Sequence, residues 1–360
     1  VLGSLALIDG LSRAEIEALF TGEGYAPRPL TDEERARLSA EPGRPPAWVE
    51  AGLPAFAAED FRATFGEDWA AQAEALMRPR APIDLRVAPG LSVEAGAAEL
   101  ADEGLSPRPT PLSARGLRLD SEPPPNVQKL EAFRAGRIEI QDEGSQLAGF
   151  LAGARPGETV VDYCAGGGGK TLVLGAALSG SGRLIACDVD PRRLDNIRPR
   201  LRRAGLSADL RQLGPDGEGL EDLTGQADLV LVDAPCSGSG TWRRRPEDAW
   251  RLTEAEVERL HALQVAILSS AAALVRPGGR LAYVTCSMLR RENEATADAF
   301  EAAAPDFRPR PIASALDVPE ITTEGRDRLA ALSAGGHRLR LGPGTTDTDG
   351  FFVALYERTA

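Results

Sequence analysis

The chain has 360 residues, of which 42% are hydrophobic and 26% charged, a composition typical of a globular protein of two or three domains. It has no apolar run near the roughly 18 residues that a membrane span needs, no signal-peptide pattern, and four cysteines without a Cys-x-x-Cys pair. We therefore expect a cytoplasmic protein with no membrane partner, no disulfide framework and no metal site. The net charge of −13, taken alone, argues against a nucleic-acid partner, because phosphate contacts need local positive potential.

The first 75 residues predict a helical segment. Ser12 is placed to cap a helix over residues 13–20, and Thr31 to cap a helix over residues 32–39, where Glu34 completes a capping-box spacing. After a proline-rich break, five aromatic residues are expected to form a small helical core: Trp48, Phe56, Phe61, Phe65 and Trp69. The chain does not begin with Met, so we expect a further N-terminal piece to precede it.

Residues 76–135 predict a small α/β module, with a strand over residues 83–87, a helix over residues 92–103 and a proline-rich linker. From about residue 136, short apolar strands alternate with helices, of which residues 253–275 form the clearest one. This alternation predicts an α/β fold whose mostly parallel sheet has helices on both faces and an antiparallel pair at its end. The predicted strands cover residues 159–163, 183–187, 209–213, 227–232, 280–285, 337–341 and 351–356.

A glycine-rich turn at residues 164–171 (CAGGGGKT) follows the first strand of this sheet, where a nucleotide can contact backbone N–H groups at a helix N-terminus. A Walker A loop requires glycine at position 164 and a dinucleotide loop requires it at position 170, so both interpretations fit poorly. A loop for S-adenosylmethionine instead needs an acid at the end of this strand and another at the end of the next. Asp162 and Asp188 meet these needs, with Asp190 as a spare, and Lys170 is expected to face a carboxylate of the cofactor or of a neighbouring Asp.

Two further cysteines follow neighbouring predicted strands, Cys236 in Asp-Ala-Pro-Cys and Cys286 in Thr-Cys-Ser. Because ligands bind beyond the carboxyl ends of parallel strands, Cys164, Cys236 and Cys286 are expected at one edge of the sheet, with Asp233 between them. Methylation of carbon 5 of a pyrimidine needs such a set. A thiolate adds to ring carbon 6, an acid such as Asp233 supplies a proton or hydrogen bond near ring nitrogen 3, and a second thiol takes part in release of the enzyme.

Six ordered motifs cover about residues 46–360: Ala81–Val87, Gln141–Gln146, Asp233–Gly240, Trp242–Trp250, Thr285–Ser287 with Glu292-Asn-Glu294, and Asp349–Phe352. Together they resemble the Sun/RsmB family of RNA (cytosine-5) methyltransferases. The resemblance implies that residues 136–360 form a Rossmann-like class I methyltransferase domain with a mostly parallel seven-stranded sheet. It also implies that residues 76–135 form an RRM-like RNA-binding module and that residues 1–75 are the remnant of a NusB-like domain.

The resemblance further implies that Cys286 is the nucleophile and that Cys236 assists product release, with Asp233 and Lys170 completing the catalytic group. The cofactor would be S-adenosylmethionine, and the partner would be RNA, in particular 16S rRNA. Gly167 stands where the family usually has proline, and Asp216 occupies a late position for the acid of the third strand. The cofactor contacts would be Cys164, Ala165, Gly166, Gly167, Gly168, Gly169, Lys170, Asp188, Asp216 and Asp233.

A cluster of Trp242, Arg243, Arg244 and Arg245 follows the first of these two cysteine turns. We expect it to contact RNA, because arginine and aromatic side chains beside a catalytic edge suit a flipped base and its flanking phosphates. The arginines of residues 192–211 fit RNA contact and a solvated helix face equally well.

The sequence thus predicts an S-adenosylmethionine-dependent RNA cytosine-5 methyltransferase with ribosomal RNA as substrate. The alternative from another class is a catalytically silent RNA assembly factor that binds S-adenosylmethionine. A DNA cytosine methyltransferase, in which Cys236 would be the nucleophile, and a nicotinamide oxidoreductase are the other interpretations.

Overall fold

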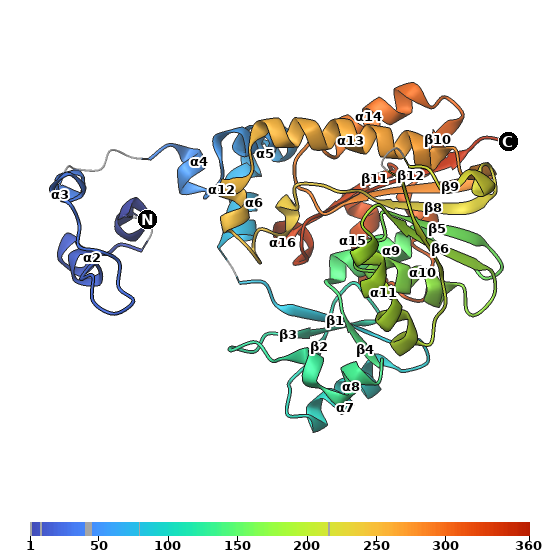
Figure 1. Cartoon of the computed structure of the whole chain (residues 1–360), viewed down its shortest axis with the longest axis horizontal. Helices are drawn as coiled ribbons and strands as arrows, with labels where there is room; N and C mark the ends of the chain where they lie inside the picture. The colour runs from blue at the N-terminus through green and yellow to red at the C-terminus, as the bar shows by residue number, and fades with distance from the viewer. Residues whose placement is uncertain (1, 8, 40–44, 79, 215–216) are drawn as a thin grey trace.

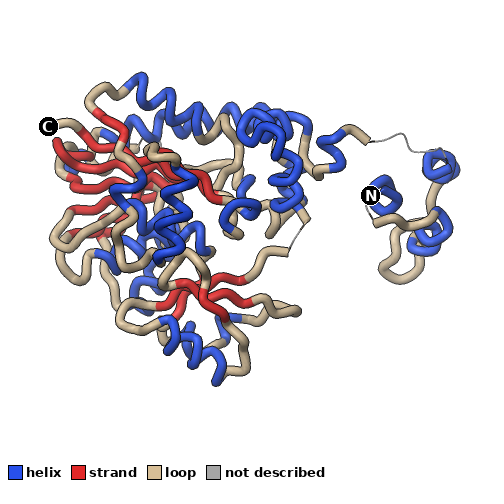
Figure 2. Tube along the Cα trace, turned by 180° about the vertical axis from the view of Figure 1, so that it is seen from behind, coloured by secondary structure: helices blue, strands red, loops and turns tan. Residues whose placement is uncertain are grey.

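The computed structural model describes residues 2–7, 9–39, 45–78, 80–214 and 217–360. Its largest part is an eight-stranded sheet with helices on both faces (Figures 1 and 2). The strands are β5 (Thr159–Tyr163), β6 (Arg183–Asp188), β7 (Asp209–Gln212), β8 (Ala227–Asp233), β9 (Val275–Thr285), β10 (Phe307–Pro309), β11 (Arg338–Leu341) and β12 (Phe351–Arg358). Their order is β10-β12-β9-β8-β5-β6-β7, and β11 also pairs with β12.

The observed sheet confirms the predicted parallel core with an antiparallel end. Strands β7, β6, β5, β8 and β9 are parallel, whereas β12 runs antiparallel to β9, β10 and β11. The sheet has eight strands in the described residues rather than the seven expected, because the short β10 shares the outer edge of β12 with β11. The predicted helix over residues 253–275 also ends early, since α13 stops at Ala272 and Val275 already pairs with Ala227.

Two apolar cores cover the two faces of this sheet. Successive residues of β5 point to opposite faces, so Val160 belongs to one core and Val161 to the other. The helices of this part are α9 (Glu143–Ala152), α10 (Gly169–Ala177), α11 (Pro191–Ala204), α12 (Glu247–Arg251), α13 (Glu254–Ala272), α14 (Glu294–Ala303), α15 (Thr323–Ser333) and α16 (Pro343–Thr346). Among the described residues, none of the helices combines the length and apolarity needed to cross a bilayer.

A separate four-stranded antiparallel sheet forms the small module. Its elements in chain order are β1 (Ile83–Val87), α7 (Val93–Asp102), β2 (Arg108–Pro109), β3 (Gly116–Leu119), α8 (Glu131–Arg134) and β4 (Ile138–Ile140), and its strand order is β2-β3-β1-β4. This βαββαβ order with β1 and β3 in the centre is the ferredoxin-like topology that an RRM-like module has. The boundary predicted at residue 136 falls too early, because β4 pairs with β1 and so belongs to this sheet.

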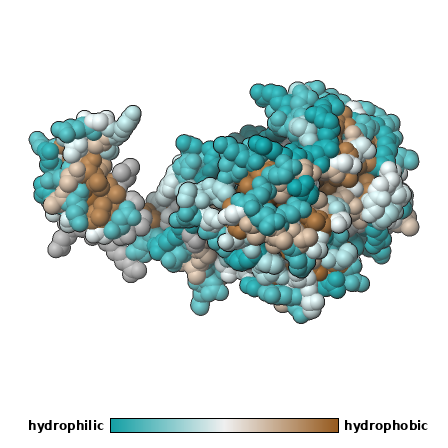
Figure 3. Space-filling model, turned by 90° about the horizontal axis from the view of Figure 1, so that it is seen from below, coloured by the Kyte–Doolittle hydropathy of each residue, from teal (hydrophilic) through white to brown (hydrophobic). Residues whose placement is uncertain are grey.

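The N-terminal helices fall into two groups that pack differently. Helices α1 (Leu2–Leu7), α2 (Arg13–Leu19) and α3 (Asp32–Ser39) lie together, apart from the rest of the molecule (Figure 1), and hydrophobic side chains are exposed over them in Figure 3. The cap predicted at Ser12 and the capping box predicted at Thr31 are both present, and Ser12 forms a capping box with Glu15 as well. In contrast, α4 (Ala47–Glu50), α5 (Ala55–Phe65) and α6 (Trp69–Met77) share one core, the predicted aromatic residues included, with Trp242 and Met288 of the large domain.

A buried ion network joins the small module to the large domain. Arg118 of β3 donates two hydrogen bonds to Asp84 of β1, at 2.6 and 2.8 Å, and a third to Asp347. The side chains of Arg118 and Asp84 are fully buried. Asp84 also accepts from the backbone N–H of Glu143 at the start of α9. The network therefore fixes the small sheet against the domain that carries the strand ends.

We expect Arg118→Leu to destabilise the chain by about 3–5 kcal/mol, because it leaves the buried Asp84 without its counter-charge. Urea unfolding measures this loss. The matched control is Arg108→Leu, which removes an exposed pair with Asp120 and is expected to cost less than about 1 kcal/mol. Equal destabilisation by the two variants would contradict the assigned role of the network.

Candidate active site

The candidate site lies at the edge of the large sheet where three neighbouring strands end. Tyr163 of β5 lies beside Val232 of β8, and Asp233 of β8 lies beside Val284 of β9. Because these strands are parallel, the turns that follow them leave the sheet at the same edge. The glycine-rich turn and the two cysteine turns are therefore neighbours in space.

The glycine-rich turn is held by the end of β6. Cys164 begins the turn with a φ of 65°, in the left-handed region, and Gly166 N–H donates to Asp188 Oδ2 over 3.0 Å. Gly168, with a φ of 81°, is the N-cap of α10, and a Cβ added there would lie 3.0 Å from Ile197. The backbone thus requires glycine at position 168, and the turn leads into a helix N-terminus, which suits a polar or anionic ligand group.

Two buried acids flank this turn, Asp162 at the end of β5 and Asp188 at the end of β6. Asp188 accepts hydrogen bonds from the backbone N–H groups of Gly166 and Asp190, so it shapes the turn. Asp162 Oδ2 accepts from Thr171 Oγ1 at 2.6 Å, whereas Oδ1 is buried and has no hydrogen-bond partner among the described residues. A buried oxygen without a partner beside a glycine turn fits a cofactor that carries hydrogen-bond donors, as S-adenosylmethionine does.

Lys170 links the glycine-rich turn to the strand that carries the first cysteine turn. Its Nζ lies 2.9 Å from Asp233 Oδ2 and 5.0 Å from the ring centroid of Phe351. Burial lowers the pKa of Lys170, but the neighbouring Asp233 outweighs burial, so that the pKa is raised and the ammonium form is retained. The prediction that Lys170 faces a carboxylate is confirmed, with Asp233 as its partner.

The two predicted catalytic cysteines lie together. The Sγ atoms of Cys236 and Cys286 are 3.4 Å apart, within hydrogen-bond distance for sulfur, although 50 residues separate them in the chain. Both side chains are only partly buried. The hydrogen bond with Cys286, reinforced by burial, raises the pKa of the Cys236 thiol. Cys236 therefore retains its proton more firmly than a free thiol does, and either sulfur is able to act as the donor in this contact.

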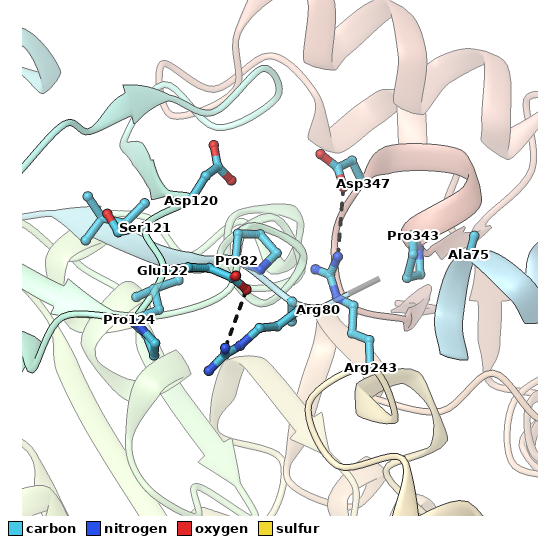
Figure 4. A pocket seen from close by; sticks show the side chains of 13 residues that line it. Ala75, Arg80, Pro82, Asp120, Ser121, Glu122, Pro124, Arg243, Pro343 and Asp347 are labelled. Atoms are coloured by element: carbon cyan, nitrogen blue, oxygen red, sulfur yellow. Dashed lines mark hydrogen bonds and ion pairs between the residues drawn. The ribbon is translucent and has the colours of Figure 1, made fainter. Parts of the chain in front are cut away.

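The predicted RNA-binding cluster is wrong for two of its four residues. Trp242 is 1% exposed and packs in the core shared with α5 and α6, so its ring is closed to a base. The side chain of Arg243 is 3% exposed and pairs with Asp349, Asp142 and Asp347, and Figure 4 shows its ion pair with Asp347, beside which both residues line a pocket. These carboxylates lie more than 95 residues away in the chain, and local charge patterning does not reveal such partners.

The other two arginines of the cluster differ in exposure. Arg244 is one-third exposed and shares the carboxylates of Asp142 and Asp349 with Arg243. Arg245 is two-thirds exposed and pairs with Glu247 and Asp248 of α12, the short helix that begins two residues later. Trp250, which is 55% exposed, lies on the same helix, α12. RNA contact at Arg245 therefore stays a prediction, and the exposed aromatic ring of this segment is that of Trp250.

Two acids of this region had no predicted role beyond their place in a motif. Glu292 is fully buried and accepts hydrogen bonds from both cysteine turns. Asp349 pairs with Arg243 and Arg244. The sequence offered one indication of a role for these acids, because each lies in a motif of the same set as those that carry the predicted catalytic residues. Asp216, which was predicted to contact the cofactor, lies outside the described residues.

Comparison with known proteins assigns the family. The family model for 16S rRNA methyltransferase RsmB/F matches residues 150–357. The chain belongs to the RsmB/F family. It is 33% identical over 325 residues to ribosomal RNA small subunit methyltransferase B of Xanthomonas campestris, an alignment that covers 89% of this chain and 69% of that relative. The resemblance seen in the sequence motifs is thus confirmed.

Two solved structures from Pyrococcus horikoshii share the fold. A methyltransferase homologue has a TM-score of 0.69 and 27% identity, covering 87% of this chain and 97% of its own. NSun6, solved with SFG, has a TM-score of 0.72 and 21% identity, covering 86% of this chain and 99% of its own. The predicted Rossmann-like methyltransferase fold is confirmed, and the RsmB/F protein is an RNA methyltransferase whose methyl donor is S-adenosylmethionine.

Burial raises the pKa of Asp162 to about 7, so the stability of the folded chain is expected to depend on pH through this group. The folded chain binds this proton more tightly than the unfolded chain, so the unfolding free energy falls as the pH rises from about 4 to about 7 and is unaffected by this group above that range. Asp162→Asn removes the effect. As the pH rises from 4 to 8, we expect the unfolding free energy of this variant to increase by about 4 kcal/mol relative to that of the unaltered chain. Urea unfolding without cofactor at both pH values measures this difference.

The control is Asp228→Asn, because the pKa of Asp228 is lowered in the folded chain, whereas that of Asp162 is raised. Burial tends to raise the pKa of Asp228, but hydrogen bonds from Thr159 N–H and Arg276 outweigh burial and lower it. This variant is expected to show a pH-dependent difference only below about pH 4. If Asp162→Asn and the unaltered chain lose stability in parallel from pH 4 to pH 8, the assigned protonation of Asp162 is wrong.

Proposed function

We propose that this RsmB/F protein methylates carbon 5 of a cytosine in 16S rRNA through a covalent bond between Cys286 and ring carbon 6. The observation that carries the proposal is the 3.4 Å distance between the two sulfurs, at the same sheet edge as the Lys170–Asp233 pair. The relative from Xanthomonas campestris is named a ribosomal RNA small subunit methyltransferase, which supports the same RNA as substrate.

The reaction needs a nucleophile, a partner for the ring nitrogen and a base. The Cys286 thiolate bonds to ring carbon 6, and the electron pair displaced from the double bond makes carbon 5 nucleophilic. The Asp233 carboxyl supplies a proton or hydrogen bond to ring nitrogen 3 or its exocyclic neighbour as the thiolate adds, and the Lys170 ammonium, 2.9 Å from Asp233 Oδ2, balances the negative charge left on the carboxylate. S-adenosylmethionine supplies the methyl group that carbon 5 takes. A base then takes the carbon 5 proton, the electron pair of that bond re-forms the double bond between carbons 5 and 6, and the bond to carbon 6 breaks with its electrons on the Cys286 sulfur. Ring nitrogen 3 returns its proton to Asp233, and Cys236 assists this release.

The glycine-rich turn and its acids are suited to hold the cofactor. The turn of residues 166–169 leads into the N-terminus of α10, and Asp188 is fixed at the turn, where a carboxylate is suited to ribose hydroxyls. The solved NSun6 holds SFG, an analogue of S-adenosylmethionine, on the same fold. These features support the predicted contacts of residues 164–170, Asp188 and Asp233, and Asp216 remains a prediction.

The arrangement of thiols also separates the proposed function from the alternatives. A silent assembly factor has no need of two sulfurs in contact beside an acid, so the geometry favours an enzyme. A DNA-type mechanism would use Cys236 as nucleophile, but the hydrogen bond with Cys286 and burial raise the pKa of Cys236 and disfavour its thiolate.

We expect Cys286→Ala to abolish methyl transfer to small-subunit rRNA while S-adenosylmethionine still binds, because the variant lacks the nucleophile but keeps the glycine-rich turn. Transfer of labelled methyl groups, bisulfite mapping of the RNA and calorimetry of cofactor binding measure these outcomes. Cys187→Ala is the matched control, since Cys187 is fully buried within β6. Retained turnover by Cys286→Ala would overturn the assignment.

We expect Cys236→Ala to trap the enzyme on RNA, because the covalent bond through Cys286 still forms while its release is impaired. A denaturing gel with labelled RNA and S-adenosylmethionine should show a shifted RNA–protein band. The double variant with Cys286→Ala should lose that band. Absence of any denaturation-resistant band with Cys236→Ala counts against the release role of this thiol.

A further inference from the structure

The two sulfurs are held together by loops rather than by the sheet itself. β8 ends at Asp233 and β9 ends at Thr285, so both cysteines lie beyond the last paired residues of their strands. Their contact at 3.4 Å therefore depends on what fixes the two turns to each other. One backbone bond, from Gly240 N–H to the carbonyl of Cys286, crosses between them.

The two turns are also linked through side chains, and the carboxylate of Glu292, just before α14, accepts hydrogen bonds from both of them. Glu292 Oε1 accepts from the backbone N–H of Ser237 at 2.8 Å and from Nε2 of Gln264 at 3.1 Å. Glu292 Oε2 accepts from the hydroxyls of Ser237 and Ser287, each at 2.5 Å. Ser237 directly follows Cys236 and Ser287 directly follows Cys286, so one carboxylate is hydrogen-bonded to the residue next to each cysteine.

The carboxylate of Glu292 is buried, and both of its oxygens accept two hydrogen bonds. It is fully buried, and four donors reach its two oxygens, the pattern that an ionised carboxylate satisfies because it accepts only. Ser239 extends the set, since its hydroxyl lies 3.0 Å from that of Ser287 and accepts from the backbone N–H of Met288. The donors come from both turns and from α13, so loss of the acid would leave several buried donors without a partner.

We propose that Glu292 is a positioning residue for methyl transfer, which clamps the turn of Cys236 onto the turn of Cys286 so that both sulfurs reach the same cytosine ring. The inference rests on the proposed function, and adds to it a residue that touches neither substrate nor cofactor. In this role Glu292 sets how often the two thiols adopt the productive distance, while the glycine-rich turn and its acids remain unchanged.

The test is Glu292→Gln, which keeps the shape but offers one acceptor oxygen and a donating amide to four donors. Single-turnover methyl transfer is expected to fall by about 10- to 100-fold, because a displacement of about 1 Å between reacting groups costs up to about 100-fold in rate. The dissociation constant for S-adenosylmethionine is expected to stay the same. The matched control is Glu301→Gln on α14, a carboxylate that accepts from His337, Arg338 and Tyr356 away from the thiols and is expected to leave the transfer rate unchanged.

A second readout reports the distance between the thiols without any methyl transfer. Diamide oxidises two neighbouring thiols to a disulfide and is itself reduced to the hydrazine, and peptide mapping assigns the bond to Cys236 and Cys286. The unaltered protein is expected to form this bond readily, and Glu292→Gln at least about 10-fold more slowly. Ser287→Ala, which removes one donor from the turn of Cys286, provides the same comparison if Glu292→Gln does not fold, with a smaller effect of the same sign.

The two readouts separate this inference from the proposed function. If Glu292→Gln and Ser287→Ala both form the disulfide as fast as the unaltered protein, the clamp is wrong, whatever the activity. If disulfide formation slows in these variants while Cys286→Ala still methylates RNA, the clamp stands and the proposed mechanism falls. A weaker affinity of Glu292→Gln for S-adenosylmethionine would indicate general disruption of the domain and overturn the positioning role.

Discussion

The parallel pairing of β8 with β9 is the constraint on which the site depends. The pairing places Asp233 beside Val284, so the turns that carry Cys236 and Cys286 begin within one strand spacing of each other. The same sheet places β5 on the other side of β8, so that Lys170 of α10, the helix that follows β5, reaches Asp233 Oδ2 with its Nζ at 2.9 Å. The order of the strands, more than any local sequence feature, therefore assembles cofactor turn, acid and thiols from segments more than 100 residues apart.

The site is built from charges that burial makes costly and that neighbouring groups satisfy. Asp162 is raised to a pKa of about 7 by burial, and Asp142 to about 7 by burial together with the nearby Asp349 and Asp84. Glu292 is instead satisfied by four hydrogen bonds. A buried carboxylate that is fully hydrogen-bonded is rigid, whereas one that keeps an unpartnered oxygen is free to accept a ligand. This difference separates Glu292, which holds the turns, from Asp162, which borders the cofactor turn.

Local sequence patterns were sufficient to predict the strands and helix caps, but not the tertiary contacts of the side chains. The strands that carry the site were predictable because apolar runs end in turns rich in glycine or proline, and both capping boxes were predictable because they span four residues. The burial of Trp242 was not, since its core forms with α5 and α6, more than 160 residues earlier in the chain. The boundary at residue 136 failed for the same reason, because only the pairing with β1 assigns β4 to the small sheet.

The acidic net charge is compatible with RNA as substrate once the partners of the arginines are known. Arg118 and Arg243 form ion pairs with carboxylates inside the protein. A phosphate would have to lose its water to replace those carboxylates, and removing a charge from water is costly, so these arginines are not available to RNA. Exposed pairs such as Arg245 with Asp248 contribute little to stability, so a phosphate can take the place of the carboxylate at little cost. The charge available to RNA is thus set by the exposed arginines near the sheet edge, and the total of 54 acids against 41 bases does not measure it.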